Sequence, residues 1–148
     1  MKNVCFVITT RGNYGKLQSV IEATEKYSNL NHQIIVGGGA ILHKYGKFFS
    51  DGTLNGRKID REAYFLVEGE NPVTMAKSTG LALLEFTDAF EHLKPDIVIV
   101  LGDRFESMAI TIAARYTNIP VAHIEGGEVS GSIDNSIRNA ISQMAQFN

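Results

Sequence analysis

Five short apolar segments recur along the chain, and longer segments with helical spacing separate them. The apolar segments are residues 3–9, 32–38, 63–67, 96–102 and 119–125. They show no regular alternation of apolar and polar positions, which is typical of strands that are covered on both faces. The pattern therefore predicts five buried strands of a parallel sheet.

Apolar and small residues at i, i+3, i+4 and i+7 fill the segments between these strands, which indicates amphipathic helices. This spacing runs through residues 17–24, 81–90, 108–116 and 133–144, and Pro95 and Pro120 follow the second and third of these helices. Strands that alternate with helices predict βαβ units with right-handed crossovers. We therefore expect an α/β fold built on a doubly wound parallel sheet.

Two regions fit this alternation less well. Residues 37–53 predict a short helix, and a mobile loop is expected in "GKFFSDGTLNGRK". The last helix keeps its apolar spacing up to Phe147, and the sequence shows no glycine, proline or returning strand that would end it. We therefore expect that a second half, carried on the same or another chain, completes the protein.

Composition narrows the class of protein. The 148 residues are 44% hydrophobic, which suits one domain with a substantial core. A net charge of -2 argues against nucleic-acid binding driven by bulk charge. The single cysteine, Cys5, excludes a disulfide framework. No run approaches the ~20 apolar residues of a membrane span, and no signal peptide precedes the first strand, so we expect no membrane partner and a cytoplasmic location.

Charged residues and glycines follow several of the predicted strands directly. Ligands of an open parallel sheet bind outside the carboxyl ends of its strands, so these residues are expected to share one edge. Glycines there allow close backbone approach and positive φ, and helices starting near Tyr14, Phe105 and Asp134 would offer free N–H groups to an anion. The residues expected at this edge are Arg11, Gly12, Asn13, Tyr14, Lys16, Gly102, Asp103, Arg104, Glu106, Glu125, Gly126, Gly127, Glu128, Asp134 and Arg138.

Some of these residues have a structural alternative. Asp134 follows two serines near a helix start and can be a cap or a first-turn acid. Arg104 can be a surface charge, and His123 is more typical of a buried, hydrogen-bonded histidine than of a metal ligand. Asp103 and Glu125 favour a function, because the end of a central strand rarely needs a carboxylate for structure. Neither a G-x-G-x-x-G fingerprint after the first strand nor a P-loop occurs.

Three longer stretches carry a family resemblance. "TTRGNYGKL", "VLGDRFESMA" and "IPVAHIEGGEVSGSIDNSIRNAIS" resemble the hydrolysing UDP-N-acetylglucosamine (UDP-GlcNAc) 2-epimerases of sialic-acid and related nonulosonate biosynthesis. The resemblance covers essentially the whole chain. It implies a glycosyltransferase-B-like architecture with the active site between two Rossmann-like halves. Residues 1–148 match the N-terminal half as one domain, and the C-terminal half is absent.

The resemblance also implies a reaction and its residues. In the family, removal of the C2 proton and loss of UDP give a 2-acetamidoglucal, and addition of water releases N-acetylmannosamine. Asp103, Glu125 and Asp134 stand at the family's catalytic carboxylates. No cofactor and no metal are expected. The positions matched to substrate or phosphate binding are Arg11, Arg104, Arg138, Gly126 and Gly127.

The chain departs from the family pattern at several places. The family reads "TRADYGKL" where this chain has Gly12 and Asn13, and it commonly has histidines where this chain has Asn139, Gln146 and Asn148. Amides form hydrogen bonds but do not shuttle protons near neutral pH. Two alternatives to a UDP-GlcNAc epimerase therefore stay open. One is the same chemistry on a UDP-2,4-diacetamido-trideoxyhexose for legionaminic acid, and the other is a non-catalytic remnant or UDP-sugar-binding module that self-associates or pairs with a separate C-terminal half.

Overall fold

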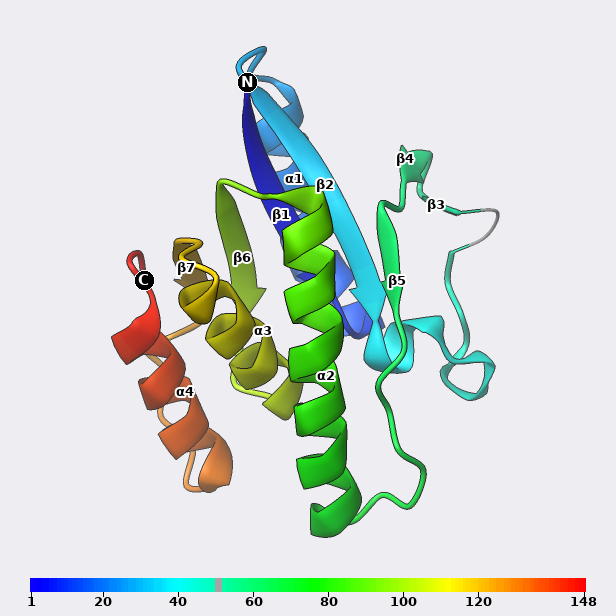
Figure 1. Cartoon of the computed structure of the whole chain (residues 1–148), viewed down its shortest axis with the longest axis vertical. Helices are drawn as coiled ribbons and strands as arrows, with labels where there is room; N and C mark the ends of the chain where they lie inside the picture. Colours follow the sequence, from blue (N-terminus) through cyan, green and yellow to red (C-terminus); the bar gives the residue numbers. More distant parts are fainter. Residues whose placement is uncertain (50–51) are drawn as a thin grey trace.

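The computed structural model describes residues 1–49 and 52–148. Within these residues, five parallel strands form one sheet in the order β5-β2-β1-β6-β7 (Figure 1). Every neighbouring pair in this sheet is parallel, as the apolar segments predict. The strands are β1 (Lys2–Ile8), β2 (Leu30–Gly37), β5 (Arg61–Ala63), β6 (Ile97–Leu101) and β7 (Val121–Ile124).

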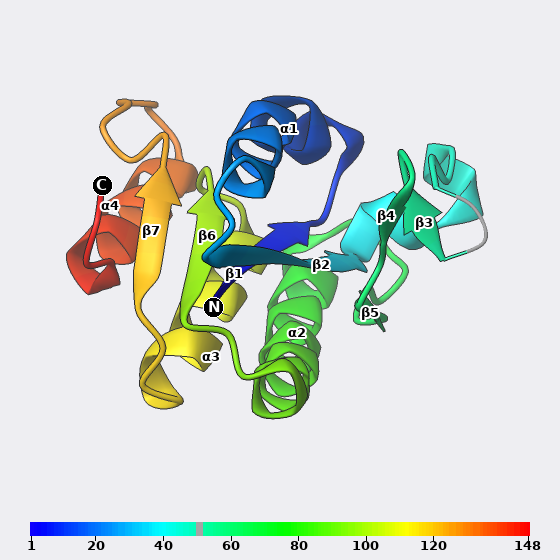
Figure 2. The same ribbon diagram turned by 90° about the horizontal axis from the view of Figure 1, so that it is seen from above.

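Helices cover both faces of the sheet, which confirms the doubly wound α/β fold. Figure 2 shows α1 (Arg11–Glu25) on one face and the other three helices on the opposite face. Those three are α2 (Pro72–Leu93), α3 (Phe105–Tyr116) and α4 (Ile133–Met144). The chain moves outward from β1 in one direction to β2 and β5 and in the other to β6 and β7, so the topological switch point lies between β1 and β6.

Alternate residues of the central strand enter two separate cores. Phe6 and Ile8 pack under α1, whereas Cys5 and Val7 pack under the other three helices, and all four are buried. This two-sided burial explains why the strand sequence shows no polar alternation. Burial also raises the pKa of the Cys5 thiol, which makes it a structural side chain rather than a reactive one.

The helix starts follow from local capping. Thr10 caps α1: its side chain accepts a hydrogen bond from the N–H of Asn13, and the Asn13 side chain accepts one from the N–H of Thr10. The helix therefore begins at Arg11, three residues before the expected start near Tyr14. Asn13, one of the departures from the family pattern, thus has a structural role at the end of β1.

The strand predicted at residues 63–67 is wrong in its position. Strand β5 covers Arg61–Ala63, and its last residue pairs with Gly37, where β2 ends. Beyond that point β2 turns into the 3₁₀ helix η1 (Gly38–Ile41), so no neighbouring strand remains for residues 64–67. Phe65, only 3% exposed, packs into the core instead with Leu66 against it, whereas Tyr64 is 62% exposed.

The segment between β2 and β5 holds more structure than its sequence predicts. The expected short helix is confirmed as η1 and a second 3₁₀ helix, η2 (His43–Tyr45). Part of the expected mobile loop is instead an antiparallel hairpin of β3 (Thr53–Leu54) and β4 (Arg57–Lys58), in which Leu54 is buried. Residues 50–51, which that prediction also included, lie outside the described residues.

The expectation that nothing follows the last helix is wrong. Helix α4 ends at Met144, and Ala145 turns the backbone into an extended conformation. Phe147 then pairs with Ala122 in parallel, and its carbonyl accepts a hydrogen bond of 2.8 Å from the N–H of His123. The final residues therefore satisfy the free edge of β7. Separately, none of the helices described is both long and apolar enough to cross a lipid bilayer.

Candidate functional site

The carboxyl ends of β1, β6 and β7 carry the residues that the sequence singles out. Arg11 opens α1 after β1, Asp103 follows β6, and Glu125 follows β7. Because β1, β6 and β7 are neighbours and parallel, all three residues lie at the same edge of the sheet, on both sides of the switch point. This placement confirms the edge that the strand pattern predicts.

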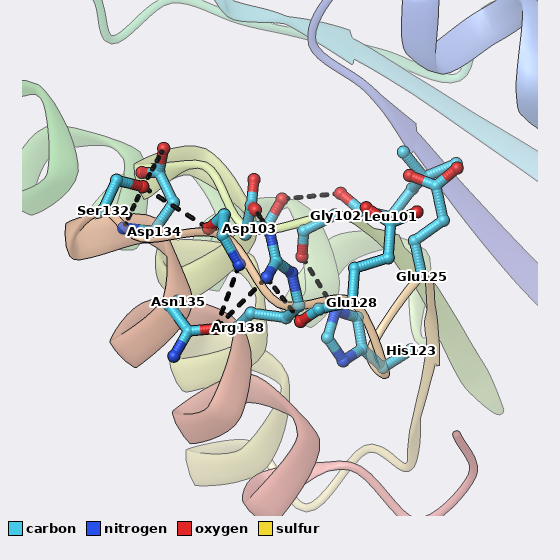
Figure 3. Close-up of polar contacts among 12 residues, drawn as sticks. Leu101, Gly102, Asp103, His123, Glu125, Glu128, Ser132, Asp134, Asn135 and Arg138 are labelled. Carbon is cyan, nitrogen blue, oxygen red and sulfur yellow. Dashed lines mark hydrogen bonds and ion pairs between the residues drawn. The ribbon is translucent and has the colours of Figure 1, made fainter.

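Asp103 is bound by an arginine from the last helix. Figure 3 shows the guanidinium of Arg138 between the loop after β6 and the loop after β7. Its Nη2 donates a hydrogen bond to Asp103, and its Nη1 donates one of 2.6 Å to the backbone carbonyl of Glu128. Arg138 is only 4% exposed, whereas the side chain of Asp103 is 23% exposed. The carboxylate therefore faces the edge while the arginine holds it from behind.

Asp134 lies apart from this ion pair. Ser132, rather than Asp134, caps α4 by accepting a hydrogen bond of 3.3 Å from the N–H of Asp134. Asp134 is exposed in the first turn, where the helix dipole favours a negative charge. Figure 3 draws Asp134 and Glu125 on opposite sides of the Asp103–Arg138 pair. The three predicted carboxylates thus share one edge without contacting one another in the bonds described.

Glu125 occupies a strained backbone position. Its φ of 67° is in the left-handed region, which a non-glycine residue rarely adopts and which often marks a functional site. Its carboxylate contacts Lys16 of α1, with 2.7 Å between Nζ and Oε1. The hydrogen bond to Glu125, and then the charge of that carboxylate, raise the pKa of Lys16. This ion pair connects α1 to the loop after β7 at the carboxyl edge of the sheet.

His123 is a satisfied structural histidine, as its sequence context predicts. It is 3% exposed, and its Nε2 lies 2.8 Å from the carbonyl oxygen of Gly102. A carbonyl only accepts, so Nε2 carries the proton, and Nδ1 is then free to accept from the Ser142 hydroxyl at 2.9 Å. The ring therefore connects the end of β6 to α4.

The glycines act differently from the prediction. Among Gly12, Gly102, Gly126 and Gly127, positive φ occurs only at Gly102, with 79°. The left-handed turn after β7 falls on Glu125 instead. Gly126 is required by packing, because a Cβ there would lie 2.6 Å from the Ser142 hydroxyl.

The sequence places Glu106 at this edge but predicts neither its burial nor its partner. Glu106 is 1% exposed, and it accepts hydrogen bonds from Nε and Nη2 of Arg104 at 3.1 and 3.2 Å. Desolvation is the largest single influence on the pKa of Arg104 and lowers it, but the charge and hydrogen bond of Glu106, together with the charges of Asp134 and Asp103, outweigh it and the pKa is raised. The side chain of Arg104 is 57% exposed, so Glu106 fixes a cation at the surface of the edge. A carboxylate one residue into a helix gives no sequence signal that distinguishes it from a first-turn acid.

A pocket of about 500 Å³ opens next to these residues. Arg11, Arg104 and Glu106 line it, whereas Asp103, Glu125 and Asp134 do not. The edge is therefore divided into an acid cluster, formed by the loops after β6 and β7, and a pocket beside it. Among the described residues, no three acidic, histidine or cysteine side chains are arranged to hold a metal ion.

Comparison with known proteins decides the family. The sequence model of the UDP-N-acetylglucosamine 2-epimerases matches residues 22–148. The chain belongs to this family. The acid cluster and the pocket therefore belong to a member of this family, as the sequence motifs indicate.

Three curated relatives align with 99% of this chain. A UDP-N,N'-diacetylbacillosamine 2-epimerase (hydrolyzing) of Legionella pneumophila is 36% identical, and a GDP/UDP-N,N'-diacetylbacillosamine 2-epimerase (hydrolyzing) of Campylobacter jejuni is 33% identical. A UDP-N-acetylglucosamine 2-epimerase of Neisseria meningitidis is 29% identical. The chain spans only 38–39% of the length of these three relatives.

The fold of the chain also matches solved structures. A crystal structure of UDP-GlcNAc 2-epimerase from Neisseria meningitidis bound to UDP-GlcNAc superposes with a TM-score of 0.80 at 24% identity, over 97% of this chain and 39% of that one. The likeness establishes the Rossmann-like half of a glycosyltransferase-B-like fold.

The amides that replace common family histidines lie mostly away from the acid cluster. Gln146 Oε1 accepts a hydrogen bond of 2.9 Å from the N–H of Val121, at the amino end of β7. Asn148 Nδ2 donates to the carbonyl of Ser142 at 3.3 Å, and Asn139 is exposed on α4. Gln146 and Asn148 therefore hold backbone groups in place, outside the acid cluster formed by the loops after β6 and β7.

Proposed function

We propose that residues 1–148 are the N-terminal Rossmann-like half of a hydrolysing UDP-sugar 2-epimerase that converts UDP-GlcNAc and water to N-acetylmannosamine and UDP. The observation that carries this proposal is the pairing at adjacent strand ends: Asp103 with Arg138, and Glu125 with Lys16. Both carboxylates stay partly exposed at the edge while a cation holds each one. Family membership supplies the reaction class. On this proposal the chain does not complete turnover alone.

The proposed chemistry requires proton transfer at two stages. A carboxylate takes the C2 proton, the C1–O bond to UDP breaks, and a 2-acetamidoglucal forms. Water then adds across the double bond, with its hydroxyl at C1 and a proton delivered to C2. Positioned acids and bases accelerate such steps by about 10²- to 10⁴-fold each. Asp103, Glu125 and Asp134 are the proposed catalytic carboxylates.

The cations divide into two proposed roles. Arg11 and Arg104 line the open pocket and are proposed to contact the leaving diphosphate. Arg138 is buried and occupied by Asp103, so its proposed role is to hold that carboxylate rather than to reach substrate by itself. Gly126 and Gly127 are proposed to let the substrate approach the backbone after β7.

A second substrate has specific support. The Legionella pneumophila and Campylobacter jejuni relatives are both named for a diacetylbacillosamine nucleotide, and both are more than 30% identical to this chain. The same elimination and hydration apply to a UDP-2,4-diacetamido-trideoxyhexose, because they involve C1 and C2 only. This substrate is therefore the alternative within the proposed function.

The test measures UDP release by the chain alone and by a joined enzyme. The joined enzyme is this chain followed by the part of the Legionella pneumophila relative that the chain does not cover. We expect release from a UDP-2-acetamido sugar only by the joined enzyme. Release by the chain alone would contradict the need for a second half. If neither protein releases UDP although both are folded, the result would contradict the epimerase proposal and favour the non-catalytic binding module.

The edge also predicts self-association of the isolated chain. Val129 and Ile133, which flank the acid cluster, are 90% and 72% exposed, and Met75 at the start of α2 is 51% exposed. Apolar groups gathered at one edge favour a covering partner. We propose that the second half covers them in a cytoplasmic enzyme. A sedimentation profile that stays monomeric at high concentration of the isolated chain would contradict the self-association.

A further inference from the structure

Two acidic residues occupy the same position in two helices of the site. Glu106 is the second residue of α3, and Asp134 is the second residue of α4. The positive end of a helix dipole stabilises an acid in the first turn, and it does so while the acid stays in water. Asp134 is exposed and fits this role, whereas Glu106 is only 1% exposed. The helix dipole therefore does not explain why the carboxylate of Glu106 is buried.

The buried carboxylate has one partner, and the geometry of that pair is specific. Among the residues that the structure describes, Glu106 is the only buried carboxylate. Removing a carboxylate from water is costly unless a cation and hydrogen bonds compensate it. Nε of Arg104 lies 3.1 Å from Oε2 of Glu106, and Nη2 lies 3.2 Å from Oε1. Both oxygens accept from the guanidinium, so Glu106 fixes the orientation of this group as well as its charge.

The other side of the Arg104 guanidinium has donors to spare. A guanidinium carries its N–H groups in a rigid fork, and Glu106 binds those on the Nε–Nη2 side. Nη1 forms no hydrogen bond with the described residues. The side chain of Arg104 is 57% exposed, and it lines the pocket of about 500 Å³ together with Phe105 and Glu106. The N–H groups of Nη1 and one N–H of Nη2 therefore remain for a ligand.

Arg104 is also attracted toward the acid cluster. Desolvation is the largest influence on its pKa and lowers it, whereas Glu106, and after it the charges of Asp134 and Asp103, raise it. Neither Asp103 nor Asp134 lines the pocket. In the absence of the Glu106 carboxylate, we therefore expect the guanidinium to turn toward these two acids and away from the pocket.

We infer that Glu106 is a positioning residue, which holds the Nε–Nη2 side of Arg104 so that the rest of the guanidinium receives the diphosphate leaving from C1 of the sugar. Two oxygens of a diphosphate match the two remaining donor nitrogens of the fork. Glu106 itself does not touch the substrate and acts through Arg104. The inference rests on the proposed function, in which Arg104 contacts the diphosphate, and extends it to a residue outside the three proposed catalytic carboxylates.

The first experiment separates the phosphate contact from the rest of the site. In the joined enzyme, UDP and uridine, which lacks both phosphates, are compared as inhibitors of the formation of the free sugar. Glu106→Gln keeps the size of the side chain but offers one acceptor oxygen in place of two. We expect the inhibition constant of UDP to rise about tenfold, the loss of one charge-assisted hydrogen bond, and that of uridine to change less than about twofold. An equal rise of both constants would overturn the inference, because a general disturbance of the site acts on both inhibitors.

The second experiment tests whether Glu106 acts through Arg104. Arg104→Met is expected to raise the inhibition constant of UDP by about tenfold or more. When Glu106→Gln is added to Arg104→Met, that constant should change less than about twofold, because the guanidinium through which Glu106 acts is gone. Glu91→Gln is the matched control and should change neither constant, since Glu91 is 79% exposed at the end of α2 that lies away from the pocket. If Glu106→Gln alone does not fold, Glu106→Asp replaces it in both experiments, because the shorter carboxylate weakens the same two hydrogen bonds.

The outcomes separate this inference from the proposed function. Weaker inhibition by UDP alone, which depends on the presence of Arg104, supports Glu106 as the positioning residue. An unchanged UDP constant in the Glu106→Gln enzyme, or an equal effect of this substitution with and without Arg104, overturns the inference and leaves the epimerase intact. A joined enzyme that releases no UDP from either UDP-sugar overturns the proposed function, and this inference with it.

Discussion

The two ends of the four-residue strand β7 are held in different ways. At the carboxyl end, Glu125 has positive φ and its carboxylate contacts Lys16, a side chain from a helix on the other side of the switch point. At the amino end, the N–H of Val121 donates to the side chain of Gln146, and the last residues of the chain pair with the strand backbone. The carboxyl end therefore carries a charged side chain at an exposed edge, whereas at the amino end side-chain and main-chain hydrogen bonds satisfy the backbone groups.

This difference shows that position on the sheet decides which departures from a family pattern affect chemistry. Gln146 and Asn148 replace histidines that are common in the family, yet both bind backbone groups near the amino end of β7 or the end of α4. The carboxylates at the opposite end, Asp103 and Glu125, each form an ion pair with a cation. The loss of imidazoles at these two positions therefore gives no support to a non-catalytic remnant.

The largest expected effect is at the carboxyl end. Asp103→Asn in the joined enzyme should lower kcat for UDP release by about 10²- to 10⁴-fold, because an amide neither accepts nor delivers a proton. Asp88→Asn, on an exposed position of α2, is the matched control and should change kcat less than twofold. Equal activity of the Asp103→Asn and wild-type enzymes would remove Asp103 from the mechanism.

The next effect concerns stability. Arg138→Met should destabilise the chain by about 3 kcal/mol, because it leaves Asp103 and the Glu128 carbonyl without the buried donor. Urea unfolding measures this loss, with Arg115→Met on α3 as the control. In an Asp103→Asn background the same substitution should cost less, since no charge is left uncompensated. Additive losses in the two backgrounds would show that the ion pair carries no coupling.

The sheet and its functional edge could be predicted from the sequence because each depends on local pattern. Apolar runs such as residues 96–102 indicate burial on both faces, and the residues at or directly after the end of each run mark the strand's carboxyl end. This pattern predicts Asp103 and Glu125 as site residues from their positions alone, without their ion-pair partners. The predicted strand at residues 63–67 failed because its length depends on where β2 ends, which its own sequence does not record.

The partners of the carboxylates could not be predicted, because they come from distant parts of the chain. Arg138 is 35 residues from Asp103, and Lys16 is 109 residues from Glu125. Arg138 was expected to bind substrate, whereas the packing of α4 buries it behind Asp103. The pairing of Phe147 with β7 could not be predicted for a similar reason. The apolar spacing continues through residues 145–147, although the helix ends at Met144.

A pH titration tests the pair that joins α1 to the carboxyl end of β7. The pKa of Lys16 is raised in the folded chain by Glu125, so the pair contributes stability below the unfolded lysine value of about 10.4 and loses it as pH rises through the folded pKa. We expect Glu125→Gln to lower the Lys16 pKa toward its ordinary value in an NMR titration of the Nζ resonances. Lys2, whose pKa is raised by its hydrogen bond to Asp96, is the control and should titrate identically in both proteins. An unchanged Lys16 titration would mean that the pair does not form in solution.

The smallest effect is expected at the amino end of β7. Gln146→His loses the amide oxygen that accepts from Val121, and one such hydrogen bond contributes about 1 kcal/mol, so a modest fall in Tm should result. The kcat of the joined enzyme should change less than twofold, because residue 146 lies at the opposite end of the strand from Glu125. Restoring the histidine therefore restores no proton carrier to the acid cluster. A large rise in kcat would instead show that residue 146 takes part in the reaction. The two ends of β7 would then no longer differ in function.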